Sequence, residues 1–219
     1  MNESINHIIK KLDESYRDIN TELIYNSPFQ LLIATILSAQ CTDKIVNKTT
    51  VNLFKQYPVV KDLAEADINN VKKLIKSTGY YKLKARRIVN TSNRIIEKHN
   101  GKIPDNMQDL LKLDGVGRKT ANIVLSIVFK KNEGIAVDTH VARVSKRLNL
   151  TRNINPKKIE IDLLKVIPEE FRGRISILFI LHGRTICKAK KPDCNNCMLN
   201  NICPYGKEVL GNKRIVIKK

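Results

Sequence analysis

The segment LDGVGRKTAN, residues 113–122, constrains the fold of this chain more than any other part of the sequence. Two glycines flank Val116, and an apolar helical pattern follows them. Glycine tolerates positive φ and lets a ligand approach the backbone closely. Consecutive exposed N–H groups that lead into a helix N-terminus form a sequence-independent phosphate site. The segment therefore predicts a helix-hairpin-helix over residues 107–130 that binds a DNA backbone, and an ordinary helical corner capped by glycines is the alternative.

The contacts expected from this hairpin lie in its turn and at the start of its second helix. Phosphate oxygens are expected at Gly115, Val116, Gly117 and Arg118. Apolar side chains on either side should hold the turn and the second helix against a core, at Leu111, Leu113, Val116, Ala121, Val124 and Leu125.

The remaining sequence has helical periodicity almost throughout and few runs of period 2. Helices are predicted in the N-terminal 16 residues and at Pro28–Ala39, Asp43–Tyr57, Asp67–Ser77, Leu83–His99, Met107–Leu113, Arg118–Lys130, Asp138–Leu148, Pro156–Val166 and Glu169–Ile186. The only strand expected is Lys213–Ile217. The predicted fold class is therefore all-α, with a boundary at the polar turn around Lys131–Gly134.

The chain carries 40 Lys and Arg residues against 21 Asp and Glu, a formal charge of +19 over 219 residues. Such an excess attracts polyanions and favours a nucleic-acid partner over a merely soluble basic protein or a ribosome-associated one. A chain of this length buries roughly 70% of its unfolded surface and needs no disulfide staple. The longest apolar runs, Leu31–Leu37 and Ile175–Leu181, are far below the ~20 residues that cross a bilayer.

Lys119 lies at the start of a predicted helix, and Asp138 heads the next one 19 residues later. An unprotonated amine can attack C1′ of a deoxyribose as its base leaves, and desolvation with a helix N-terminal dipole favours that form of lysine. A carboxylate held as a helix N-cap can stabilise the sugar cation that develops. The alternatives are a surface lysine on DNA phosphate and an aspartate that only caps. His140, near Asp138, is expected to be structural.

Four cysteines near the C-terminus follow the pattern C-x6-C-x2-C-x5-C, at Cys187, Cys194, Cys197 and Cys203. The chain shows no export signal, and in a reducing compartment clustered cysteines are metal ligands more often than disulfides. Zinc is the generic metal for four thiolates, and an iron–sulfur cluster is the alternative. Cys41 stands apart and is expected to be a small core or pocket residue.

The glycine hairpin with Lys119, Asp138 and the cysteine spacing together resemble the endonuclease III family of DNA glycosylases, over roughly 28–203. The resemblance implies a two-lobed fold, with a helical barrel at 21–131 and a cluster lobe formed by 1–20 and 132–219. It makes Lys119 and Asp138 the catalytic pair and turns the four cysteines into ligands of a 4Fe–4S cluster. Lysine at this position implies a bifunctional enzyme, because glycosylases that only remove the base lack it.

Further DNA contacts follow from the same resemblance. Gln40, in LLIATILSAQCTD, matches the glutamine that fills the gap left by an extruded nucleotide. Tyr80, after Gly79, stands where some relatives carry a wedging leucine. Lys188, Lys190 and Lys191, between the first two cysteines, are expected to touch phosphate. A polar helix end and a half-buried tyrosine are the alternatives for Gln40 and Tyr80.

The expected protein is a bifunctional glycosylase and abasic-site lyase that removes oxidised pyrimidines from duplex DNA in base excision repair. It should act as a monomer on double-stranded DNA with damaged bases or abasic sites, in the cytoplasm with the nucleoid and without membrane association. The alternatives are a mismatch-directed glycosylase, a lyase for abasic sites alone, or a non-catalytic DNA-binding module with a structural metal.

Overall fold

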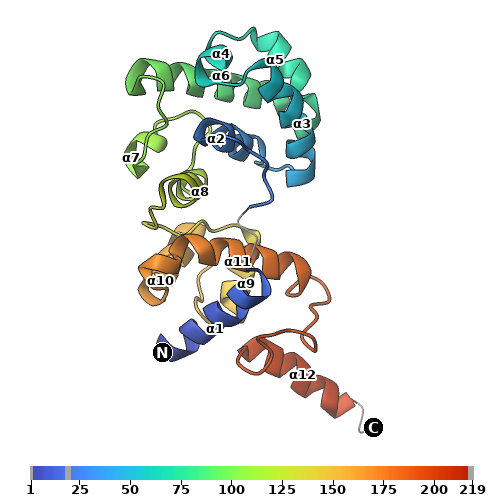
Figure 1. Ribbon diagram of the computed structural model, residues 1–219. Helices are drawn as coiled ribbons and strands as arrows, with labels where there is room; N and C mark the ends of the chain where they lie inside the picture. The colour runs from blue at the N-terminus through green and yellow to red at the C-terminus, as the bar shows by residue number, and fades with distance from the viewer. Residues whose placement is uncertain (1, 18–20, 217–219) are drawn as a thin grey trace. The chain divides into compact units, whose positions relative to one another are not determined.

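The computed structural model describes residues 2–17 and 21–216, and every regular element in those ranges is a helix (Figure 1). The all-α fold class predicted from the sequence is thus confirmed. The chain divides into two compact units, Thr21–Lys130 and a second made of Met1–Asn20 with Lys131–Lys219. We call them the hairpin unit and the cysteine unit, and each has its own hydrophobic core. None of the described helices has the length and apolar character to cross a membrane.

The hairpin unit is built around α2, in which eight of the ten residues are buried. Helices α3, α6 and α8 pack against it (Figure 1). The elements of this unit are α2 Pro28–Leu37, α3 Asp43–Gln56, α4 Val60–Ala64, α5 Ile68–Leu74, the 3-10 turn η1 Lys76–Thr78, α6 Tyr81–His99, α7 Met107–Leu110 and α8 Arg118–Phe129. Because α2 is apolar on all sides, it can serve only as the centre of a bundle.

Two helix starts in this unit follow local chemistry that can be read from the sequence. Ser27 caps α2 by accepting a hydrogen bond from the N–H of Gln30, and Pro28 takes the first helical position. Thr42 caps α3 in the same way through the N–H of Ile45. These caps satisfy N–H groups that have no partner inside the helix.

The cysteine unit joins the N-terminal helix to the C-terminal part of the chain. Its elements are α1 Asn2–Ser15, α9 Thr139–Arg147, α10 Pro156–Val166, the 3-10 turn η2 Glu169–Phe171, α11 Arg172–Thr185 and α12 Pro204–Val216. Helix α11 packs on both α9 and α1. Gly183 permits the closest approach to α9, because a Cβ there would lie 3.0 Å from the Cβ of His140.

Two expectations about elements were wrong, and one short helix was missed. The strand proposed at Lys213–Ile217 is helical as far as Val216, at the end of α12, and Ile217 lies outside the described residues. Helix α7 ends at Leu110, so Leu111 leaves the core and is 40% exposed. Helix α4 was not predicted, because five residues are too few to display a helical period.

Candidate functional site

The glycine turn of the hairpin unit is bound to α6 by two hydrogen bonds. The hydroxyl of Thr91 donates to the carbonyl of Asp114 at 2.7 Å, and the amide of Asn90 donates to its carboxylate at 2.9 Å. Leu113 and Val116 are buried beside them, so they anchor the turn to the core as the sequence predicted. The turn is therefore fixed to α6 and to the core, while Gly115 and Gly117 remain exposed.

The two glycines of this turn differ in backbone conformation and in the space around them. Gly115 has φ +79°, and a Cβ on it would lie 2.9 Å from Cδ of Arg87 and 3.2 Å from Cγ2 of Ile36. It must be glycine for both conformation and space. Gly117 is extended, with φ −99°, and a Cβ on it would meet nothing within 4 Å. The positive φ expected of the pair thus applies to Gly115 only, while Gly117 leaves open space in front of α8.

Lys119 is the second residue of α8 and directly follows this open space. Gly117 is the N-cap of α8 and offers no side-chain cap, so the first turn of the helix presents its N–H groups outward. The Lys119 side chain is exposed, and among the described residues it has neither a hydrogen bond nor an ion pair. The hairpin unit therefore leaves the Lys119 amine open to solvent.

Asp138 belongs to the cysteine unit and is the N-cap of α9. One carboxylate oxygen, Oδ1, accepts from the N–H groups of His140 and Val141, both at 2.8 Å. The carboxylate is half-buried, and these bonds fix its direction while leaving Oδ2 for another partner. His140 packs under this start: its Nδ1 accepts from Nη2 of Arg143 at 3.1 Å, a contact inside the unit.

Gln40 and Tyr80 occupy two exposed turns of the hairpin unit. Both have left-handed backbones, with φ 53° and 47°, which is uncommon for residues other than glycine. Tyr80 is 69% exposed, so it is not the half-buried turn tyrosine that was one alternative. Cys41, next to Gln40, is half-buried against the core.

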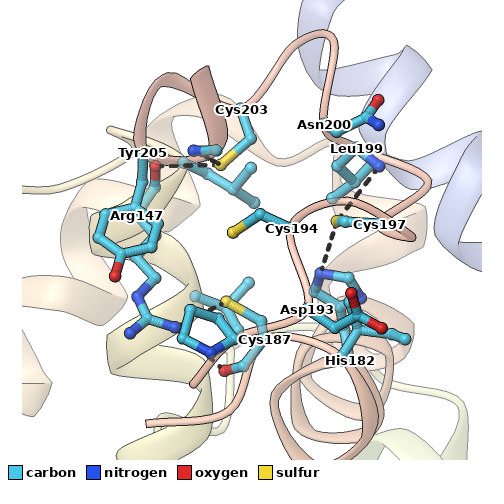
Figure 2. Close-up of a pocket in the computed structure, with 15 residues that line it drawn as sticks. Arg147, His182, Cys187, Asp193, Cys194, Cys197, Leu199, Asn200, Cys203 and Tyr205 are labelled. Atoms are coloured by element: carbon cyan, nitrogen blue, oxygen red, sulfur yellow. Dashed lines mark hydrogen bonds between the residues drawn. The ribbon is translucent and has the colours of Figure 1, made fainter. Parts of the chain in front are cut away.

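The four cysteines of the predicted cluster line a single pocket in the cysteine unit (Figure 2). Cys187 follows α11, Cys194 and Cys197 lie in the loop beyond it, and Cys203 precedes α12. No group of three His, Cys, Asp or Glu side chains gathers closely enough to hold one metal ion in residues 2–17 and 21–216. Around the cavity lie the sulfurs and a mostly apolar wall that includes Val144, Leu148 and Leu199.

Burial and hydrogen bonding act on these sulfurs in opposite directions. Burial raises the pKa of the Cys197 thiol to about 11 and also raises that of Cys203, and the neighbouring cysteines add to both shifts. Yet several N–H groups point at the sulfurs, and hydrogen bonds of this kind favour the anion. They come from Leu199 to Cys197 and from Gly206 to Cys203, each at 3.4 Å, and from Arg147 to Cys187 at 3.2 Å.

A cationic centre would resolve this conflict, because metal binding deprotonates coordinating thiols. The donor set of four cysteines with N–H groups around them fits an iron–sulfur cluster, in which each thiolate binds its own iron. His182 completes the wall of the pocket, with Nε2 3.6 Å from Sγ of Cys197, and burial lowers the pKa of this histidine to about 4.

Two arginines of α9 hold the loop between the first two cysteines, and sequence reasoning missed them. Arg143 donates through Nε to the carbonyl of Cys187 at 3.0 Å, and Arg147 donates through Nη1 to that of Lys188 at 2.8 Å. Arg147 also stacks over the ring of Tyr205, 4.3 Å from its centroid. The sequence signal was a basic pair four residues apart, which falls on one face of a helix.

The loop that these arginines hold carries the three lysines expected to touch phosphate. Lys188, Lys190 and Lys191 are all exposed, and Lys191 has a left-handed backbone with φ 52°. Helix α9 thus carries Asp138 at its start and supports this basic loop from its end. Lys119, Gln40 and Tyr80 belong to the hairpin unit, whereas Asp138 and the lysine loop belong to the cysteine unit.

A helical fold, a glycine hairpin followed by an exposed lysine, and a four-cysteine pocket define a recognisable class of DNA repair protein. Residues 33–169 match the family model of the HhH-GPD superfamily base excision DNA repair proteins. The endonuclease III of Synechocystis sp. is 47% identical over 197 residues, which cover 90% of this chain and 89% of that protein.

Solved structures agree with this match. A non-covalent endonuclease III–DNA complex superposes with a TM-score of 0.89 at 40% identity, covering 96% of this chain and 98% of that one. A trapped endonuclease III–DNA covalent intermediate, in an estranged-adenine complex, gives the same score and identity, with 96% and 99% covered. The chain therefore belongs to the HhH-GPD superfamily and, within it, to the endonuclease III family. As such it is a DNA glycosylase and abasic-site lyase of base excision repair.

Proposed function

We propose that this enzyme excises oxidised pyrimidines from duplex DNA through a covalent bond to Lys119, supported by the carboxylate of Asp138. The observation that carries the proposal is the start of α8, where an exposed lysine follows a hairpin with an open, uncapped front. A phosphate bound at Gly115, Val116, Gly117 and Arg118 would bring a deoxyribose next to the lysine amine.

The chemistry assigned to Lys119 uses its uncharged amine. Its Nζ forms a bond to C1′ while the bond from C1′ to the base breaks, and the base leaves with a proton. Opening of the sugar ring gives an iminium, which acidifies the proton on C2′. Removal of that proton expels the 3′ phosphate as the C3′–O bond breaks, and water then hydrolyses the iminium to free the lysine. Bound DNA would exclude water from the exposed amine and so favour its uncharged form.

Asp138 is proposed to act at the sugar through Oδ2. Because Oδ1 accepts both cap bonds from α9, the carboxylate is held in a fixed direction before substrate arrives. A preorganised anion of this kind stabilises the positive charge that develops on the sugar and assists proton transfer. The approach of Asp138 to Lys119 across the two units is part of this proposal.

Gln40 and Tyr80 are proposed to enter the duplex when the damaged nucleotide is extruded. The side chains are exposed at the tips of two turns, and a polar amide and an aromatic ring suit a gap between stacked bases. Tyr80 would act as a wedge, and Gln40 would help to fill the gap that the extruded nucleotide leaves.

Cys187, Cys194, Cys197 and Cys203 are proposed to hold a 4Fe–4S cluster. The cluster would fasten the loop of Lys188, Lys190 and Lys191, which then touches phosphate, and this assignment needs no electron transfer. The bonds from Arg143 and Arg147 to that loop support a positioning role. Iron and sulfide analysis of the purified holoprotein tests the assignment, and a colourless protein that carries zinc would refute it.

We further propose that the enzyme works as a monomer on DNA in the cytoplasm. Trapping with borohydride on DNA that contains an abasic site tests the central step. Wild type should give a covalent adduct, Lys119→Ala should give none, and Lys98→Ala, which removes an exposed lysine of α6, should behave as wild type. An adduct with Lys119→Ala would show that another amine attacks. A panel of thymine glycol, dihydrouracil, oxidised guanine and mismatched bases then tests the substrate assignment.

A further inference from the structure

Lys84, in the first turn of α6, is a charged residue in the interior of the hairpin unit. Only 3% of it is exposed. Lysine is almost never buried this completely unless it is paired. Burial lowers its pKa, and an electrostatic effect of the nearby Cys41 opposes that shift. A lysine kept under these conditions needs partners that offset the loss of water.

The ammonium group of Lys84 joins the ends of two helical segments. Its Nζ donates to the carbonyl of Leu37, the last residue of α2, at 2.8 Å, and to the carbonyl of Thr78, the last residue of η1, at 2.6 Å. Carbonyls at a helix C-terminus lack intrahelical partners and carry partial negative charge. The N–H of Cys41, which could close the next turn onto Leu37, donates to Ser38 at 3.1 Å instead.

Each carbonyl immediately precedes one of the two turns proposed to enter DNA. Gln40 follows Leu37 by three residues, and Tyr80 follows Thr78 by two. Both are left-handed residues other than glycine, a conformation that persists only where the surroundings hold it. A single buried cation therefore holds the base of both turns.

We propose that Lys84 is a positioning residue that locks the Gln40 turn and the Tyr80 turn to each other, so that both side chains enter the duplex together. The inference rests on the proposed roles of Gln40 and Tyr80. Two side chains can occupy one opened base step only if the distance between their turns is constant. Misplacement of a positioned group by about 1 Å can cost on the order of 100-fold in rate.

A merely structural lysine would have a different signature. Its loss would lower stability, and the contributions of Gln40 and Tyr80 to excision would stay independent. If Lys84 couples the turns, removing it already misplaces both side chains, so their own removal should then matter less. Residues that act as a unit are non-additive in this way.

The first test uses Lys84→Met, with Lys98→Met as the matched control that removes an exposed lysine from the far end of the same helix. Single-turnover excision from lesion-containing duplex should slow by about tenfold or more in Lys84→Met and not in the control. The rate loss caused by Gln40→Ala or Tyr80→Ala should shrink at least about threefold in the Lys84→Met background. Borohydride trapping on single-stranded DNA with an abasic site, which needs no base extrusion, should be unchanged.

The second test needs no DNA. The sequence contains no tryptophan, so Tyr80→Trp introduces a single tryptophan at the tip of one turn, and this residue can be excited apart from the tyrosines. Adding Lys84→Met should lower the fluorescence anisotropy at this position, whereas adding Lys98→Met should not. If Lys84→Met does not fold, Lys84→Gln, which keeps a shorter donor, takes its place in both tests.

The outcomes separate this inference from the proposed function. The role of Lys84 would be overturned if the rate loss of Lys84→Met simply added to those of Gln40→Ala and Tyr80→Ala, and if Lys84→Met left the anisotropy of the Tyr80→Trp protein unchanged. This holds even if borohydride still traps DNA on Lys119. If Gln40→Ala and Tyr80→Ala leave wild-type excision unchanged, the proposed function of these two residues fails, and the role of Lys84 in excision falls with it. In that case the anisotropy reports only whether Lys84 holds the turn.

Discussion

The helices that carry the two proposed catalytic residues, α8 and α9, begin in opposite ways. Helix α9 starts with Asp138, whose side chain satisfies two of its N–H groups. Helix α8 starts with Gly117, which provides no side chain and leaves the space in front of the helix open. Both helices pack one face on a core, so packing alone does not explain the difference.

The difference indicates which kind of group each helix start binds: a side chain of the protein itself at α9, and an external anion at α8. A capped start is complete within the protein, and its carboxylate is left with one oriented oxygen. An uncapped start is incomplete, and its N–H groups and partial positive charge suit an anion from outside, such as a phosphate. Substitutions can exchange or remove these features one at a time.

The largest effect is expected at Asp138, where capping and chemistry can be separated. Asparagine caps helices as well as aspartate does, so Asp138→Asn should keep the melting temperature of wild type. It removes the negative charge from the sugar, and excision should fall on the order of 100-fold or more. Asp138→Ala should lose the same activity and in addition about 1 kcal/mol of stability. Single-turnover kinetics and thermal unfolding measure the two effects, and an active Asp138→Asn would leave only the capping role.

A smaller effect is expected when the cap of α9 is copied onto α8. Gly117 has an extended backbone with room for a Cβ, so Gly117→Asp fits without strain and should add a few tenths of a kcal/mol of stability. The same carboxylate would occupy the phosphate site, and DNA binding should weaken by about tenfold with a salt dependence lower by about one counterion.

The matched control for this exchange is Gly117→Ala, which adds a Cβ but no cap and no charge. It should fall between wild type and Gly117→Asp in DNA affinity, because only close approach of the backbone is hindered. Fluorescence anisotropy of labelled duplex at several salt concentrations gives both the affinity and the slope. Equal affinities for all three proteins would mean that phosphate does not bind at this turn.

The neighbouring glycine should affect stability before it affects binding. Gly115→Ala forces a left-handed alanine and brings its Cβ to 2.9 Å from Cδ of Arg87. The backbone term alone costs about 1–2 kcal/mol. Chemical denaturation should detect this loss, and Gly117→Ala, whose Cβ meets nothing within 4 Å, should lose much less. Equal losses of stability at the two positions would contradict the conclusion that only Gly115 is required for the conformation of the turn.

Local signals were enough to predict much of this fold. Ser27 with Pro28 and Asn155 with Pro156 are cap and first-turn pairs whose chemistry is complete within a few residues, and their helices begin where the sequence predicted. The strand expected at Lys213–Ile217 failed because a short apolar run does not distinguish strand from helix.

The site was predictable only where one motif contains all its parts. The glycine hairpin and the cysteine spacing are of that kind. Lys84 was not, because its partners are the carbonyls of Leu37 and Thr78, 47 and 6 residues away, and a carbonyl has no sequence signature. Arg147 was missed for the same reason, since the groups it contacts around Cys187 and Lys188 are mostly backbone.

The smallest expected effect concerns α7, which supplies a capped start within the hairpin itself. The Asn106 side chain accepts from the N–H of Asp109 and donates to its carboxylate, and Lys112 donates to the same carboxylate at 2.8 Å. The bond from Lys112, followed by that from Asn106, holds the pKa of Asp109 below its usual 3.8. Because the folded pKa is the lower one, this stabilisation is present above pH 3.8 and is lost as the pH falls through the folded value. Asp109→Asn should therefore be less stable than wild type at neutral pH, and the stabilities of the two proteins should converge in acid.

Lys112→Gln should raise the pKa of the Asp109 carboxyl measured by carbon NMR, and a wild-type carboxyl that titrates at or above 3.8 would contradict the prediction. Such a result would mean that the Asn106 cap of α7 acts without a charged partner, so that the carboxylate at the start of α7 differs from the one that caps α9.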